Sequence, residues 1–144
     1  MSFTLHPRLQ LTSTLIGELP LCSVLLCKDN SVPWVILVPK VEGIRELYQL
    51  PIENQHQYLI ESQYVCKAME HLFSPDKMNI ATIGNLVPQL HVHHVARYVS
   101  DDAWPGTIWE NTSGVDRSEE HQKILTTQLR EELSRDRSFH FISA

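Results

Sequence analysis

The chain has 144 residues, of which 42% are hydrophobic, so it is long enough to bury one core, and we expect a single domain over residues 1–144. A net charge of −5, with 12 Lys+Arg against 17 Asp+Glu, argues against a general nucleic-acid binder, which needs a basic face. It leaves room for a small anionic ligand, which a few local donors can bind.

The cysteines and the N-terminus indicate the cellular compartment. Cys22, Cys27 and Cys66 are an odd number and contain no Cys-x-x-Cys pair, so neither a disulfide framework nor a structural zinc site is expected. Residues 1–8 lack the pattern of a signal peptide, and no apolar run reaches membrane-spanning length. These features predict a cytoplasmic protein without a membrane partner.

The first half of the chain predicts a short helix followed by three strands. Pro7 fits the first turn of a helix over residues 5–12. Runs of strand-forming residues predict strands at residues 14–19, 21–27 and 33–39. The turn cluster at residues 28–31 joins the last two strands into a hairpin.

The second half predicts two helices and two strands. Apolar residues at spacings of three and four predict helices over residues 53–73 and 116–135. Between them, strands are expected over residues 77–83 and 89–99, whereas residues 139–144 have no clear pattern. The expected fold class is therefore α+β, with an antiparallel sheet of about five strands, a long helix and a C-terminal helix.

Three of the eight histidines lie within four positions, in the stretch that begins at Gln89. In an extended strand, alternation places Gln89, His91 and His93 on one face. It places His94 on the other, mostly apolar face, where a buried histidine usually has a structural hydrogen-bonding role. Gln89, His91 and His93 are therefore the candidate catalytic residues.

Three roles remain open for the pair formed by His91 and His93. The pair can be structural, or it can chelate zinc or copper. A catalytic metal needs a third protein ligand, however, and no neighbouring His-Glu-x-x-His helix or carboxylate supplies one. The third role is nucleophilic catalysis, since a neutral imidazole attacks phosphorus or carbonyl centres and has an ordinary pKa of about 6.5.

The stretch Gln89–Val95 resembles the motif of the histidine triad (HIT) hydrolases and transferases, His-φ-His-φ-His-φ-φ, where φ is a hydrophobic residue. The resemblance covers most of the chain. It is strongest to a bacterial branch, similar to diadenosine polyphosphate hydrolases, that has Gly-Asn-x-x-Pro-Gln-Leu-His-x-His and a later Trp-Pro-Gly-x-x-Trp. Here these motifs begin at Gly84 and Trp104.

The resemblance implies metal-independent hydrolysis or transfer of nucleoside monophosphate groups, without a cofactor, through a nucleotidyl-histidine intermediate. Family members act on dinucleoside polyphosphates or nucleoside phosphoramidates, and are commonly symmetric homodimers whose sheets join across the dyad. By position, His91 would be the nucleophile and His93 would contact the phosphate or the leaving group. Asn85 would hold the phosphate, and Asp29, in the hairpin turn, would bind the ribose.

The chain departs from the family pattern at two places. Gln89 replaces the first histidine, and an amide can orient a partner but cannot carry a proton. Residues 79–85 are shorter than the Gly-rich loop of many members, which implies a more open leaving-group pocket. The alternatives are therefore a nucleotide-binding or interaction protein without turnover, or a metal-binding protein that uses His91 and His93.

The three tryptophans are expected mainly to be buried. Trp34 lies in an apolar run and is predicted to be a core residue. Trp104 and Trp109 lie in an irregular loop, where stacking on a base or packing in a dimer are the alternatives to burial.

Overall fold

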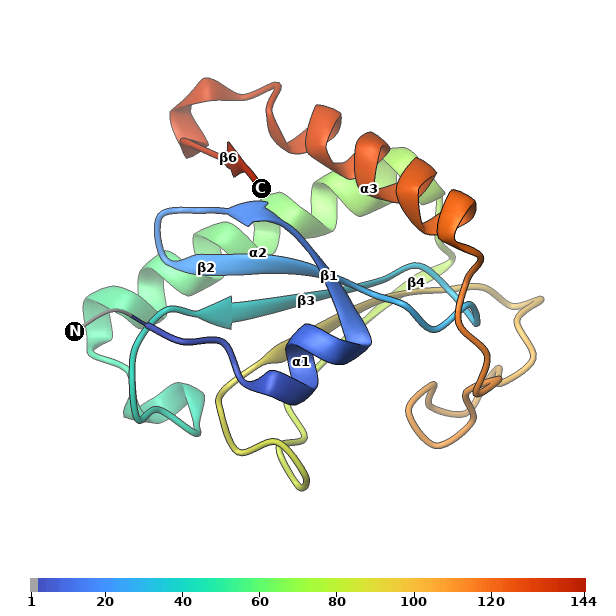
Figure 1. The fold of residues 1–144 in the computed structure, drawn as a ribbon, viewed down its shortest axis with the longest axis horizontal. Helices are drawn as coiled ribbons and strands as arrows, with labels where there is room; N and C mark the ends of the chain where they lie inside the picture. Colours follow the sequence, from blue (N-terminus) through green and yellow to red (C-terminus); the bar gives the residue numbers. More distant parts are fainter. Residues whose placement is uncertain (1–2) are drawn as a thin grey trace.

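One antiparallel sheet organises the fold. In the computed structural model, which describes residues 3–144, its strands follow the order β4-β5-β3-β2-β1-β6 (Figure 1). Every neighbouring pair is antiparallel. The strands are β1 (Ser13–Glu18), β2 (Cys22–Cys27), β3 (Trp34–Pro39), β4 (Lys77–Ala81), β5 (Val92–Arg97) and β6 (Ile142–Ser143).

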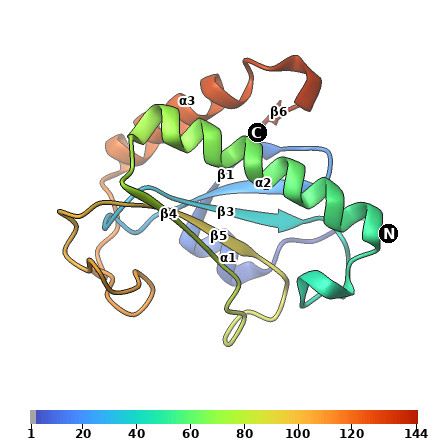
Figure 2. The same ribbon diagram turned by 180° about the vertical axis from the view of Figure 1, so that it is seen from behind.

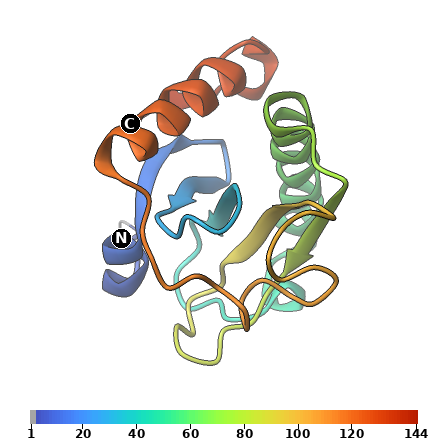
Figure 3. The same cartoon turned by 90° about the vertical axis from the view of Figure 1, so that its right-hand side faces the viewer.

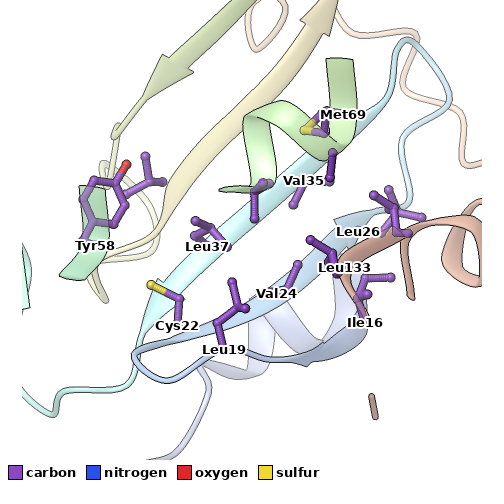
Figure 4. Packing of buried hydrophobic residues seen from close by; sticks show 14 of the residues in the cluster. Ile16, Leu19, Cys22, Val24, Leu26, Val35, Leu37, Tyr58, Met69 and Leu133 are labelled. Atoms are coloured by element: carbon purple, nitrogen blue, oxygen red, sulfur yellow. The ribbon is translucent and has the colours of Figure 1, made fainter. Parts of the chain in front are cut away.

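Two helices, α2 (Ile52–Phe73) and α3 (Glu119–Leu133), cover one face of the sheet (Figures 2 and 3). The larger apolar cluster lies between them and the sheet, and includes Ile16 of β1, Leu37 of β3 and Met69 of α2 (Figure 4). The α2 helix ends at Phe73, is capped by Ser74 in the left-handed conformation, and is followed by Pro75. None of the helices within residues 3–144 combines the length and apolar content needed to cross a membrane.

The opposite face of the sheet carries α1 (Pro7–Thr12) and two loops. A smaller apolar cluster forms there from Leu9 of α1, Trp34 of β3, Val95 of β5 and the loop residues Val87 and Ile108. Helices therefore seal one face, while short segments from distant parts of the chain cover the other. The second face is the one that carries the candidate site.

The predicted α+β class, long helix and C-terminal helix are confirmed, but the sheet has six strands rather than about five. The added strand, β6, lies in residues 139–144, where the sequence has no clear pattern. It pairs with β1 beside Gly17. A Cβ at Gly17 would overlap the Ile142 carbonyl and the Phe141 ring, so glycine permits this close approach. The short 3₁₀ helices η1 (Leu47–Gln49) and η2 (Arg137–Phe139) complete the fold.

The predicted start of the histidine strand at Gln89 is wrong, because β5 begins at Val92. The pairing of β3 with β5 extends only as far as Leu37 opposite Val92. The Leu90 amide instead donates to the Ile44 carbonyl at 2.9 Å. Residues 89–91 therefore precede β5 and are not paired with β3.

Glu61 of α2 ties the long helix to the turn between β1 and β2. Its side chain is fully buried, and its carboxylate accepts from the Leu21 amide at 2.9 Å, the Cys22 amide at 2.8 Å and the Gln57 side chain at 2.7 Å. A buried carboxylate is tolerated because these donors replace its hydration.

We expect Glu61→Ala to lower the free energy of unfolding by about 3 kcal/mol, because two buried amides lose their acceptor. Urea unfolding measures the change. Glu70→Ala, at an exposed position of the same helix, is the matched control and should change stability by no more than about 0.5 kcal/mol. Equal effects of the two substitutions would contradict this role of Glu61.

Candidate functional site

The site lies where the chain enters β5. His93 faces the smaller apolar cluster, opposite Ile36 of β3 and Ala81 of β4 in the sheet register. His91 stands just before the strand, and its ring lies edge-on to that of His93 with 5.1 Å between centroids. The structure therefore brings the two candidate imidazoles together, although His91 lies just outside the strand on which the prediction placed it.

A hydrogen bond to the main chain fixes the state of His91. Its Nδ1 lies 2.7 Å from the Gln89 carbonyl oxygen, which can only accept, so Nδ1 carries the proton. The Nε2 lone pair is then free. Burial lowers the pKa of His91. The bond to Gln89 acts in the opposite direction, whereas the charge of His6 lowers the pKa further. The residue is only 7% exposed, and the lowered pKa favours the neutral imidazole.

His93 is fixed in the opposite tautomer. The Trp34 indole N–H donates to His93 Nδ1 at 2.9 Å, so the proton of the neutral ring is on Nε2. Burial, followed by the charges of His91 and His94, lowers the pKa of His93 to about 4. His93 is thus a neutral donor at physiological pH. Trp34 is a core residue, as predicted, but it also orients this histidine.

His94 points to the other side of the sheet, where α2 packs. Its Nε2 lies 2.7 Å from the Ser62 hydroxyl and its Nδ1 lies 3.0 Å from the Val92 carbonyl. Both nitrogens are satisfied and the residue is fully buried. The predicted structural role of His94 is therefore consistent with its position.

The sequence predicted that Gln89 shares a strand face with His91 and His93, but Gln89 and His91 both lie before β5. The Gln89 side chain turns instead to the N-terminal segment. Its amide oxygen accepts from the main-chain N–H of His6, and its amide nitrogen donates to the main-chain carbonyl of Thr4, each at 2.9 Å. One residue thus holds the His91 ring through its carbonyl and the N-terminal segment through its side chain.

The two residues predicted to bind phosphate and ribose lie in loops. Asn85 is exposed and follows Gly84, whose φ of +71° makes the turn before the site. Asp29 lies in the turn between β2 and β3, where its carboxylate accepts from the Ser31 amide at 2.8 Å. The ribose role of Asp29 and the phosphate role of Asn85 remain predictions.

The two loop tryptophans are half-buried and have different neighbours. The Trp109 ring is tilted against His93, with 5.7 Å between centroids, so it borders the site. The Trp104 ring packs against the Arg97 guanidinium at 5.7 Å. Arg97 is itself buried and bonded to Asp101 at 2.9 and 3.0 Å, which lowers the pKa of that carboxyl to about 2.

Sequence reasoning missed three residues at the site, His6, Arg45 and Glu46. Arg45 and Glu46 line a small hollow against His91, together with Gly84 and Gln89. Nothing in the spacing of the sequence connects these segments, because tertiary contacts alone bring them together. Among residues 3–144, no group of three His, Cys, Asp or Glu side chains is arranged to hold a metal ion.

An antiparallel sheet that presents two neighbouring imidazoles at the entry to a central strand, with a long helix behind, defines a small class of α+β proteins. A family model described as the HIT domain matches residues 8–100. The chain belongs to the histidine triad family.

Two solved structures support this assignment. The first is a histidine triad protein from Marinobacter aquaeolei, which is 48% identical, with a TM-score of 0.89 over 94% of this chain and 98% of that one. The second is a histidine triad protein from Bradyrhizobium japonicum, which is 37% identical, with a TM-score of 0.89 over 92% of this chain and 99% of that one. A search of curated protein sequences found no match.

We expect the protein to lose stability as the pH falls from 6.5 towards 4. Burial lowers the pKa values of His93 and His94 from 6.5 to about 4, so in this interval the unfolded chain binds protons that the native state does not. Each histidine then contributes up to about 1.4 kcal/mol per pH unit to the fall.

Urea unfolding at a series of pH values tests this expectation. His93→Gln should make the dependence shallower within the interval, since one proton-binding difference is removed. His56→Gln, at an exposed position of α2, should leave the slope unchanged. An unchanged slope in His93→Gln would contradict the lowered pKa.

Proposed function

We propose that the protein is a nucleotide hydrolase or nucleotidyl transferase that cleaves a phosphoanhydride or phosphoramidate bond of a nucleoside phosphate. The observation that carries the proposal is the 2.7 Å bond from His91 Nδ1 to the Gln89 carbonyl, which leaves Nε2 as a free nucleophile. Membership of the HIT family supports the same chemistry. Dinucleoside polyphosphates and nucleoside phosphoramidates are the proposed substrates.

In the proposed first step, His91 Nε2 attacks the phosphorus of the nucleoside monophosphate unit. A P–N bond forms as the bond to the leaving group breaks, and the leaving group takes up a proton. The Nε2–H of His93 donates to a phosphate oxygen and stabilises the developing charge. Water or an acceptor then attacks phosphorus, which breaks the P–N bond and restores neutral His91.

The proposed nucleotide contacts come from two loops, one between β4 and β5 and the other between β2 and β3. We propose that Asn85 donates its amide to the phosphate and that Asp29 accepts from the ribose hydroxyls. Support comes from their positions in exposed or half-buried turns that flank the sheet, where a ligand can reach them. We further propose that the protein acts in the cytoplasm, since its three cysteines are unpaired.

His91→Ala should abolish the covalent intermediate and lower turnover by at least about 10³-fold, because no other group replaces the nucleophile. The protein is incubated with diadenosine polyphosphates and with adenosine phosphoramidate, in the presence of a chelator. Intact-protein mass spectrometry follows the nucleotidyl adduct. His56→Ala, which changes an exposed histidine of α2, is the control and should retain both adduct and turnover.

Each alternative has its own result in this experiment. Tight binding of AMP without any adduct would identify a nucleotide-binding or interaction protein instead of an enzyme. Turnover that survives His91→Ala would exclude His91 as the nucleophile. Purification with zinc or copper that is lost in His93→Ala would favour a metal-binding protein.

We also propose that the chain forms a symmetric homodimer whose sheets join across the dyad. The strand β4 lies at an edge of the sheet and is longer than β6 at the other edge. Ile80 of β4 is 50% exposed and pairs with His94, so it points to the α2 side, where Leu59 and Ile60 are also exposed. An apolar edge of this kind favours pairing with a second copy.

Ile80→Lys should convert the dimer to a monomer, because the dyad would bring two added charges close together at the joined edges. Light scattering coupled to size-exclusion chromatography measures the mass. Ile124→Lys, at an equally exposed apolar position of α3, should leave the mass unchanged. A parent protein that is monomeric throughout would rule out the homodimer.

A further inference from the structure

The histidine motif offers no proton for a leaving group. His91 is consumed as the nucleophile of the proposed reaction. Burial, followed by the charges of His91 and His94, lowers the pKa of His93 to about 4, so this ring is neutral near pH 7 and holds no second proton to give. The Gln89 amide cannot carry a proton. The motif therefore favours a leaving group that departs without taking up a proton.

Phosphate and amine leaving groups differ in this need. A phosphate oxygen departs as an anion that is stable near neutral pH, because the second pKa of a phosphate monoester is about 6. An amine needs a proton while its bond to phosphorus breaks, because the anion that would otherwise form is far more basic. A phosphate leaving group needs compensation of its negative charge instead, so a cation beside the nucleophile is the feature that identifies its site.

Arg45 is a cation beside the nucleophile. The Ile44 carbonyl accepts from the Leu90 amide at 2.9 Å, and Arg45 and His91 are the next residues along these two segments. Both residues line the same small hollow. In the part of the chain that the structure describes, the Arg45 guanidinium makes no hydrogen bond or ion pair, so its donors are available to a ligand.

A larger cavity of about 320 Å³ adjoins this hollow, because Arg45 and Gln89 line both. The cavity is lined by Gly43, Ile44, Arg45, Pro88 and Gln89. Its volume lies within the range of small-molecule sites, about 300–1,000 Å³. Glu46 lines the small hollow but not the cavity. The cavity therefore combines one charged residue, a cation, with a mostly apolar wall.

The cavity and the proposed ribose contact lie towards opposite ends of β3. Asp29 precedes this strand, and Arg45 follows it. His93 is opposite Ile36, in the middle of the same strand. If Asp29 binds the ribose of the nucleotidyl group that is transferred, the cavity at Arg45 is left for the group that departs.

We propose that the cavity beside Arg45 receives the leaving group, and that this group carries phosphate. The inference rests on the proposed function and narrows its substrates to nucleoside polyphosphates, with dinucleoside polyphosphates and nucleoside triphosphates as two sources of the same chemistry. In the first step, the Nε2 electron pair of His91 forms the P–N bond, and the ring keeps its Nδ1 proton and becomes cationic. The electron pair of the P–O bond stays with the departing phosphate, whose negative charge Arg45 compensates. That phosphate takes up a proton from water afterwards.

The experiment compares substrates that transfer the same adenylyl group to His91. Diadenosine tetraphosphate releases ATP, and ATP releases pyrophosphate. The p-nitrophenyl ester of AMP releases a phenolate without phosphate, and an alkyl phosphoramidate of AMP releases an amine. Rapid quench and intact-protein mass spectrometry give the second-order rate constant of adduct formation. The ratio of the parent rates with the tetraphosphate and with ATP distinguishes a nucleotide from pyrophosphate as the preferred leaving group.

We expect Arg45→Gln to slow adduct formation about 10-fold or more with both polyphosphates, because a charge-assisted contact to phosphate is lost. The nitrophenyl ester should lose less than about threefold, because its leaving group carries no phosphate. Arg45→Lys should retain part of the rate with the polyphosphates, since it retains the charge. The parent protein should react more slowly with the phosphoramidate than with the tetraphosphate.

Two further variants are the controls. Glu46→Gln removes a negative charge from the small hollow and should not slow the polyphosphates. Arg135→Gln changes an exposed arginine that follows α3, on the other side of the sheet, and should leave all of the rates unchanged.

Several results would overturn the assignment. Equal losses with the ester and the polyphosphates in Arg45→Gln would show that Arg45 acts on the fold or on the adenylyl group. A parent protein that reacts faster with the phosphoramidate than with either polyphosphate would exclude a phosphate leaving group. Absence of an adduct with every substrate would refute the proposed function itself, whereas a parent adduct whose rate does not depend on Arg45 refutes only the role of Arg45.

Discussion

The site depends on the point at which the chain enters the sheet, because β5 begins at Val92, three residues after Gln89. A carbonyl in the ladder of β5 would be occupied by a neighbouring strand, but the ladder stops at Val92. The Gln89 carbonyl is therefore free to accept from the His91 ring. The same departure turns the Gln89 side chain away from the strand face and towards the N-terminal segment. Because residues 89–91 are not paired with β3, Gln89 can bind both the His91 ring and the N-terminal segment.

Neighbouring histidines in this motif receive different hydrogen-bonding partners, and these partners decide their roles. A carbonyl at Nδ1 leaves His91 with a free Nε2 lone pair, as the proposed nucleophile requires, whereas an indole N–H at Nδ1 leaves His93 with a proton on Nε2. His94 is saturated by Ser62 and Val92 and has no free nitrogen. Residue type alone does not distinguish these rings, because the tautomer is set by what each nitrogen meets.

The sequence was sufficient for the elements whose signal is local. The spacing of apolar residues predicted α2, and alternation correctly separated His93 from His94. The strand boundary at Gln89 was wrong, because the end of a ladder depends on its partner, here β3, and not on local propensity. The strand β6 was missed for a similar reason, since it exists only where Gly17 admits it.

The candidate site was predictable only as far as its motif reached. His6 and Gln89 are 83 positions apart, and Trp34 and His93 are 59 positions apart, so no periodic pattern in the sequence connects either pair. A search for histidines near the motif would have passed over His6. Gln89 was the visible departure from the histidine pattern that the sequence resembles, but the sequence does not show which segment its side chain binds.

Burial limits the protonation states that the two motif histidines can adopt. The enclosure that keeps His91 and His93 neutral also opposes any charged imidazole in their place, since burial penalises the charged form. A side chain that alternates between charged and neutral forms is therefore disfavoured inside this enclosure. The N-terminal segment borders the enclosure, because the Gln89 side chain holds its main chain at Thr4 and His6. Glutamine at this position thus links two parts of the site, since its carbonyl accepts from the His91 ring while its side chain binds that segment.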